Sequence, residues 1–258
     1  MSELVSHEGF DIEKTYEYIL SIQVSLDGFS FSILSQHEDK ILASKINLFK
    51  ISSTALIARR FNDWLEFEEL LKKPFRKVRV TIFSEKFTLI PEEYFQDRLK
   101  QDIPPLLFGE NDEPEIAENI VRELATRVIF TLPPGLNKVI AEQIGECEIV
   151  HPVKIILSNL PKTEKENGLI LLFDAKNFYV VLFKNNKVLL ANCFKISHVN
   201  DVVYYVLTTL KQLEIPVSKT DLFIIKSVNK LSGIDESLKS YFTEIKELKL
   251  IQFLLDVI

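Results

Sequence analysis

Apolar and polar positions between residues 18 and 83 predict a strand hairpin, a third strand, a helix and a fourth strand. Asp27-Gly28 is a strong turn signal, and the residues after it alternate with period two, as in a half-buried strand. The hydroxyl residues at 52–54 are candidate helix caps, and Pro74 stops the helix. The expected strands cover 18–24, 29–34, 41–49 and 78–83, and the amphipathic helix covers 52–71.

The same order of elements returns between residues 168 and 225. A turn is expected at 174–177 after the first strand of this half. Asn200 or Asp201 is the expected helix cap, and Pro216 ends the helix. Strands are expected over 169–173, 178–183, 188–194 and 222–225, with the helix before the last one. Each half therefore carries a β-β-β-α-β unit, and a repeat of about 150 residues indicates duplicated domains rather than a solenoid.

The first half carries extra chain before the second unit begins. Its expected elements are an extended segment at 87–90, a helical segment at 91–99, an acidic loop at 109–118, a strand at 128–131, a helix at 133–144 and a strand at 148–150. Residues 162–167 are charged and lack periodicity, which places a domain boundary there. The predicted fold is α/β with mixed sheets, in two domains over 1–161 and 162–258.

Composition narrows the function classes. Only 7 of the 258 residues are glycine, against an average near 7%. Their positions exclude a GxGxxG turn and a GxxxxGK[ST] loop. The net charge of −6 argues against a nucleic-acid partner, which selects for a basic surplus.

Three features predict a cytoplasmic protein. The first residues are polar and acidic, unlike a secretory signal. No apolar run approaches the roughly 20 residues of a transmembrane helix. The two cysteines, Cys147 and Cys193, do not make a disulfide framework.

Four segments together resemble an uncharacterised bacterial family with a degenerate actin-like ATPase fold. They lie at residues 20–29, 87–95, 151–152 and 185–194. The resemblance spans nearly the whole chain, and it implies two ribonuclease-H-like domains of the kind shared by sugar kinases, heat-shock chaperones, actin and pilus-assembly ATPases. In active members nucleotide lies between the domains, with two acidic hairpin turns facing the phosphates and a divalent metal.

The resemblance carries over to Asp27, Gly28 and Asp174 as vestigial cofactor-binding residues. Glycine matters in such turns because a missing Cβ lets backbone N–H groups approach phosphate oxygens. Bulky Phe29 follows the first turn, and the second turn contains no glycine. The stretch at 226–230, where active members place an adenosine-binding glycine pair, contains none either. A magnesium ion on the two aspartates competes with the simpler interpretation that Asp-Gly and Asp-x-x-Asn make good turns.

Two cysteine–histidine pairs have a superficial zinc spacing. Cys147 precedes His151, and Cys193 precedes His198, but the pairs fall in different halves. Buried structural cysteine is the favoured alternative. No GxSxG elbow and no activated thiol context occur, so no catalytic residue and no metal ligand are assigned.

Two surface features remain open. A basic cluster could contact an anionic partner or form a solvated helix end, and the second interpretation is favoured. Its members are Lys72, Lys73, Arg76, Lys77 and Arg79. The apolar end of the chain, residues 248–258, is expected to pack on its own core, with partner docking as the alternative.

These observations favour a non-catalytic scaffold or protein-binding module of unknown partner, without cofactor. The alternative is an ATPase or small-molecule kinase that binds ATP with magnesium in an atypical cleft. A partner in a membrane-anchored assembly is a third hypothesis, from fold analogy alone. A cleft plugged by Phe29 or Phe178 would favour the scaffold.

Overall fold

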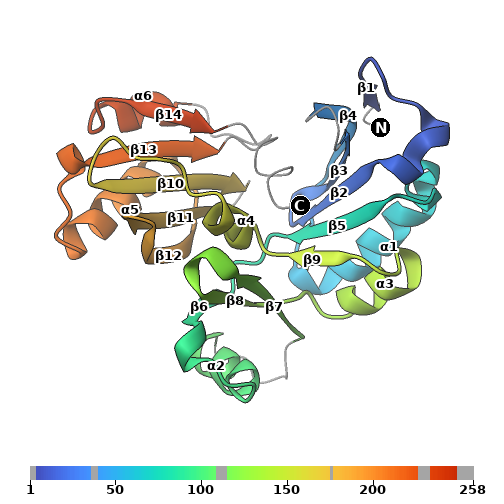
Figure 1. Ribbon diagram of the computed structural model, residues 1–258, viewed down its shortest axis with the longest axis horizontal. Helices are drawn as coiled ribbons and strands as arrows, with labels where there is room; N and C mark the ends of the chain where they lie inside the picture. Colours follow the sequence, from blue (N-terminus) through green and yellow to red (C-terminus); the bar gives the residue numbers. More distant parts are fainter. Residues whose placement is uncertain (1–3, 36–39, 109–114, 175–176, 226–232, 249–258) are drawn as a thin grey trace.

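The computed structural model describes residues 4–35, 40–108, 115–174, 177–225 and 233–248. The first half is built on a six-stranded sheet in the order β1-β4-β3-β2-β5-β9 (Figure 1). Its strands are β1 (Val5–Ser6), β2 (Ile19–Ser25), β3 (Gly28–Ser35), β4 (Lys40–Leu48), β5 (Lys77–Ile82) and β9 (Glu148–Val150). Two helices, α1 (Ile57–Phe67) and α3 (Leu136–Gln143), pack beside each other on this half.

The second half repeats this plan in a five-stranded sheet of order β12-β11-β10-β13-β14. Its strands are β10 (Asn167–Asp174), β11 (Asn177–Lys184), β12 (Lys187–Lys195), β13 (Thr220–Ile225) and β14 (Ile245–Leu248). Its helices are α5 (Val199–Gln212) and α6 (Ile234–Lys239). In each copy of the unit the first two strands, β2–β3 or β10–β11, form an antiparallel hairpin, and the first of them pairs in parallel with the strand after the helix. The duplicated β-β-β-α-β unit is confirmed; β9 or β14 adds a fifth strand to each sheet, and β1 adds a sixth to the first sheet.

A third sheet, with order β6-β8-β7, is inserted after β5. Its strands are β6 (Phe87–Pro91), β7 (Ile116–Val121) and β8 (Thr126–Thr131), and α2 (Leu99–Phe108) projects from it. The helix α4 (Pro152–Ser158) then joins the first half to the second. Strand β6 contacts β12, and β7 contacts β9, so this sheet bridges the two halves.

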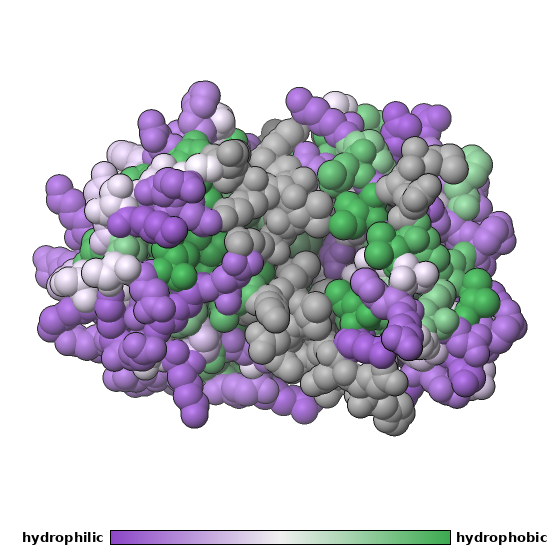
Figure 2. Space-filling model, turned by 90° about the horizontal axis from the view of Figure 1, so that it is seen from above, coloured by the Kyte–Doolittle hydropathy of each residue, from purple (hydrophilic) through white to green (hydrophobic). Residues whose placement is uncertain are grey.

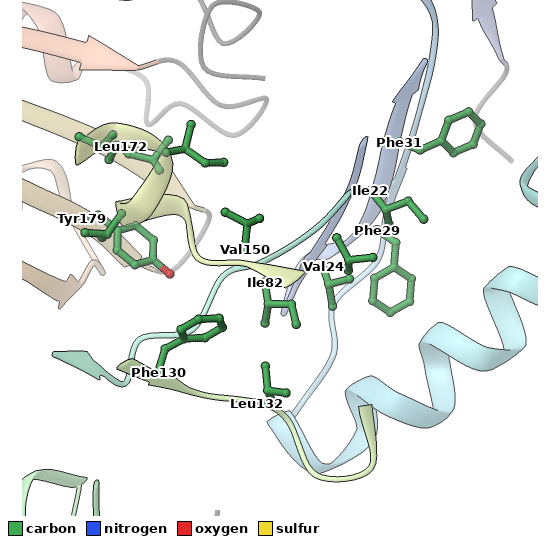
Figure 3. Close-up of a cluster of buried hydrophobic side chains, with 14 of the residues drawn as sticks. Ile22, Val24, Phe29, Phe31, Ile82, Phe130, Leu132, Val150, Leu172 and Tyr179 are labelled. Carbon is green, nitrogen blue, oxygen red and sulfur yellow. The ribbon is translucent and has the colours of Figure 1, made fainter. Parts of the chain in front are cut away.

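One apolar cluster runs through both halves. It includes Ile22 and Phe29 from the first sheet, Phe130 from the third, and Leu172 and Tyr179 from the second sheet (Figure 3). A second cluster fills the other face of the second sheet beneath α5 and α6. The halves are therefore not separately packed bodies, because they share a core.

Several local predictions were wrong. The helix expected over 52–71 is regular only to Phe67, because Glu68 leaves helical geometry and a 3₁₀ turn follows. Ser53 makes no side-chain cap. The N-cap of α5 is His198, and Asp201 completes its capping box from the third helical position. Strand β3 is buried on both faces rather than half-buried.

The inserted region holds the other differences. The segment expected to be helical at 91–99 has only a 3₁₀ turn, Glu92–Tyr94, before α2 begins at Leu99. The acidic loop expected to reach residue 118 gives way to strand β7 from Ile116. Helix α4 was not predicted.

Candidate functional site between the two halves

The ends of β2 and β10, where the two hairpins begin to turn, lie toward the middle of the molecule (Figure 1). Strands β2 and β5 run toward the second half, and β10 and β13 run toward the first (Figure 1). Ligands of open α/β sheets bind at the carboxyl ends of parallel strands. This region is therefore the place to look for a site, and Asp27, Gly28 and Asp174 lie at its border.

The backbone of the first turn is bonded to its own half. The Asp27 amide donates to Ser25 Oγ over 3.1 Å. The Asp27 carbonyl accepts from the Phe49 amide at 2.9 Å, and the Leu26 carbonyl accepts from the Ile51 amide at 2.7 Å. The two carbonyl bonds fasten the turn to the chain that leaves β4. The Asp27 amide already has an acceptor in Ser25.

The missing side chain of Gly28 also serves the fold. Its φ is +128°, a conformation that other residues rarely adopt. A Cβ here would lie 2.0 Å from the Asn47 carbonyl oxygen. Close approach of β4 therefore explains this glycine without a phosphate.

The two aspartates are not equivalent in the repeat. Strand register pairs Ser25 with Gly28 in the first hairpin and Asp174 with Asn177 in the second. Asp174 thus corresponds to Ser25, and Asn177 corresponds to Gly28. Residues 175–176 lie outside the described part of the chain, as do residues 226–230.

Phe29 and Phe178 do not plug the space between the halves. The Phe29 ring packs 5.1 Å from Phe61 and 5.4 Å from Trp64, both in α1. The Phe178 ring packs 6.3 Å from Tyr205 in α5. Each phenylalanine therefore faces the helix of its own half, so neither ring supplies the plugged cleft that would have favoured the scaffold.

A buried polar joint connects the halves instead. The Ser84 carbonyl accepts from His151 Nε2 at 2.9 Å and from the Tyr179 hydroxyl at 3.1 Å. His151 Nδ1 accepts from the Val153 amide at 3.2 Å, which assigns the ring proton to Nε2. Burial lowers the pKa of His151 to about 3, and the bond to Ser84 only partly opposes this. The neutral imidazole is a structural group of the joint.

This geometry gives His151 and His198 structural roles. Both ring nitrogens of His151 are engaged, and His198 caps α5. Burial, reinforced by Glu148, raises the pKa of the Cys147 thiol to about 11. Burial likewise raises the pKa of Cys193. Within the described residues no group of three or more histidine, cysteine or acidic side chains could hold a metal.

The predicted basic cluster is not one surface. Lys72 pairs with Glu69, and Lys73 pairs with Glu13. Arg79 is 1% exposed on β5 and bonds Glu148. The helix-end interpretation is therefore wrong for Arg79, which lies inside the first sheet.

Sequence reasoning missed the polar face on which Arg79 lies. Ser21, Gln23 and Ser25 alternate along β2, and Arg79 and Thr81 alternate along β5. This period-two signal was present, but residues 18–24 were interpreted as a buried strand, and no polar face was assigned to residues 78–83.

Viewed from above, hydrophilic residues cover much of both halves, and hydrophobic patches are scattered among them (Figure 2). No helix in the described part of the chain is long and apolar enough to span a membrane.

Comparison with solved structures confirms the actin-like ATPase fold. A protein of unknown function with this fold from Bacteroides thetaiotaomicron VPI-5482 is 20% identical, with a TM-score of 0.81 over 96% of this chain and 99% of that one. The PilM-PilN type IV pilus biogenesis complex matches at 10% identity and a TM-score of 0.53, over 89% of this chain and 88% of that one.

The sequence comparisons agree. A family model described as a protein of unknown function, DUF3822, matches residues 7–245. No curated protein matches the sequence significantly.

Proposed function

Since the chain belongs to the DUF3822 family, with an actin-like ATPase fold, we propose that it is a non-catalytic scaffold that binds another protein. One observation carries the proposal. The Asp27 amide of the first hairpin turn already donates to Ser25 Oγ, and the close approach of the Asn47 carbonyl accounts for Gly28 without a phosphate. A turn with fewer backbone N–H groups to offer a phosphate loses contacts that a nucleotide site needs.

The second hairpin supports the same proposal. Asn177 is 6% exposed and stands where the first repeat has Gly28. The second hairpin therefore carries a side chain at the position where the first hairpin has glycine. As part of this proposal, the scaffold works in the cytoplasm and needs no cofactor.

The shared core suits a scaffold. An enzyme that closes around substrate needs its domains to move. Here the joint of Ser84, His151 and Tyr179 holds the halves together within one apolar cluster. The similar PilM structure is a complex with PilN, which favours a protein partner, including one in a membrane assembly.

The alternative is a nucleotide-binding ATPase or kinase. Asp174 favours it, since a carboxylate at the end of β10 could hold magnesium through water. The other half offers Ser25 at the corresponding position.

A thermal-shift titration with ATP and magnesium tests the proposal. The scaffold predicts no change in Tm up to millimolar nucleotide. Binding at 100 times Kd would stabilise the protein by about 2.7 kcal/mol. A rise in Tm that Asp174→Asn abolishes and Asp235→Asn, on α6, preserves would refute the proposal.

A further inference from the structure

Helix α2 carries an apolar face that extends beyond the sheet on which the helix packs. Leu99, Ile103, Leu106 and Leu107 follow the i, i+4, i+7, i+8 spacing that places side chains on one side of a helix. Leu99 and Ile103 are half-buried, and α2 contacts strand β8. Leu106 is 83% exposed and Leu107 is 58% exposed. The same face is therefore covered at the start of α2 and uncovered at its end.

The first turn of α2 attaches the helix to the third sheet. Lys100 Nζ lies 2.7 Å from Glu118 Oε1, on β7, and 5.5 Å from the centroid of the Phe95 ring. From there the helix projects away from the sheet (Figure 1). A helix of 10 residues that contains two consecutive prolines gains little stability from its own backbone. A partner that covers the end of α2 therefore stabilises the helix as well as burying apolar surface.

The part of the chain around α2 is acidic. Residues 92–108 and 115–127 hold seven acidic and four basic side chains, which give a net charge of −3. These 30 residues carry half of the net charge of −6 of the whole chain. A negative surface repels anionic lipid headgroups and nucleic-acid phosphates. The charge therefore favours a basic protein partner over a membrane.

Internal ion pairs do not cancel this surplus. Lys100 Nζ lies 3.4 Å from Asp97 Oδ1 and 2.7 Å from Glu118 Oε1. The Arg127 guanidinium lies 2.7 Å from Glu92 Oε1 and 3.1 Å from Glu118 Oε2. Three carboxylates thus share two cations, and a negative charge remains after pairing.

We propose that the uncovered end of α2, formed by Leu106 and Leu107, docks a basic amphipathic segment of a protein partner. Apolar side chains of that segment cover the two leucines, and its lysines or arginines face the acidic surplus, including exposed Asp102. This inference rests on the proposed protein-binding function and specifies the chemistry of the partner. The surface lies on α2 rather than in either hairpin turn.

Fluorescence anisotropy with labelled peptides tests the proposal on the full chain. The probe is an amphipathic helical peptide of leucine and lysine, and its counterpart has glutamate in place of lysine. The lysine peptide should bind, and the glutamate peptide should not. Leu106→Ser combined with Leu107→Ser should weaken binding by about tenfold or more, because two apolar anchors are lost. The matched control, Leu189→Ser combined with Leu213→Ser, changes two exposed leucines of the second half and should leave binding unchanged.

Three results of the peptide experiment would overturn the docking site. They are failure of the lysine peptide to bind, equal binding of the two peptides, and binding that survives the double substitution in α2. Both leucines of α2 are exposed, so that variant should keep its Tm, and lost binding is then not lost folding.

Other occupants of the surface give distinct results. Dimers of the chain alone in sedimentation, dissolved by the double substitution in α2, would assign the surface to a second copy and overturn the proposed partner. Anionic vesicles that bind through the same leucines would assign it to a membrane and overturn it equally. All of these results leave the nucleotide test untouched, whereas an ATP-dependent rise in Tm that needs Asp174 refutes the scaffold without changing the peptide result.

Discussion

At the scale of single residues, function and packing compete to explain the same side chains. Gly28 has a sufficient structural reason in the Asn47 carbonyl. His151 has one in the Ser84 and Val153 bonds. Ser21 and Thr81 have none in their contacts, since their hydroxyls are buried without partners among the described residues. Packing therefore explains Gly28, whereas it does not explain the buried hydroxyls of Ser21 and Thr81.

Gly28→Ala should destabilise the protein strongly. The new Cβ meets the Asn47 oxygen at 2.0 Å, and the positive φ adds strain of about 1–3 kcal/mol. Gly145→Ala is the matched control, because its φ is +80° and nothing lies within 4 Å. Urea unfolding should show a clearly larger loss for Gly28→Ala, and equal losses would contradict the packing explanation.

His151 should make stability depend on pH. Its folded pKa, about 3, lies below the ordinary value of 6.5, so the unfolded chain takes up the proton first. Its contribution is complete above pH 6.5 and is lost as pH falls toward 3, at up to about 1.4 kcal/mol per pH unit. Urea midpoints at pH 7, 6 and 5 measure this loss.

The His151→Gln variant should be less stable at pH 7, and its urea midpoint should fall less between pH 7 and pH 5. An unchanged slope in this variant would assign the pH dependence to other groups.

At the scale of elements, the sequence predicted regular strands well and inserted pieces poorly. The hairpin turns and the alternating or continuous apolar runs located both repeats. Helix α2 was missed because Pro104 and Pro105 discourage a helix. The polar face was missed because Ser21 and Gln23 look compatible with any buried strand until β5 places Arg79 and Thr81 beside them. The local pattern of apolar and polar residues does not predict which strands far apart in the sequence pair with each other.

Asn119 attaches the third sheet to the first half through two hydrogen bonds. Its amide nitrogen donates to the Ile149 carbonyl at 2.8 Å, and its oxygen accepts from the His151 amide at 2.7 Å. Asn119→Ala leaves both backbone groups unpaired, at about 1–3 kcal/mol each. Differential scanning calorimetry should show a lower Tm, whereas exposed Asn137→Ala in α3 should not. Equal Tm values for the two variants would show that the third sheet is held by other contacts.

At the scale of the whole molecule, the shared core and the polar joint couple the halves. The duplicate domains of this fold could in principle unfold one after the other. Here Leu172 and Phe223 of the second sheet belong to the same cluster as Ile22 and Phe130. Removing either half would expose that surface, so the halves should gain stability from each other.

The coupling predicts a single unfolding transition. Trp64 is the only tryptophan and lies in α1 of the first half, so its fluorescence reports on that half, while far-ultraviolet circular dichroism reports on both. Leu182→Ala lies in the separate core beneath α5, and it should cost about 2–5 kcal/mol. If the halves unfold together, this distant substitution lowers the urea midpoint of Trp64 fluorescence as much as that of circular dichroism.

The exposed substitution Lys187→Ala, on β12 of the same half, should move neither midpoint. A Trp64 transition that stays in place while the dichroism signal splits in two would show independent halves, and the rigid joint proposed for a scaffold would then be absent. Coincident shifts would instead mean that a partner or ligand bound to one half stabilises the other, because binding energy acts on the whole cooperative unit.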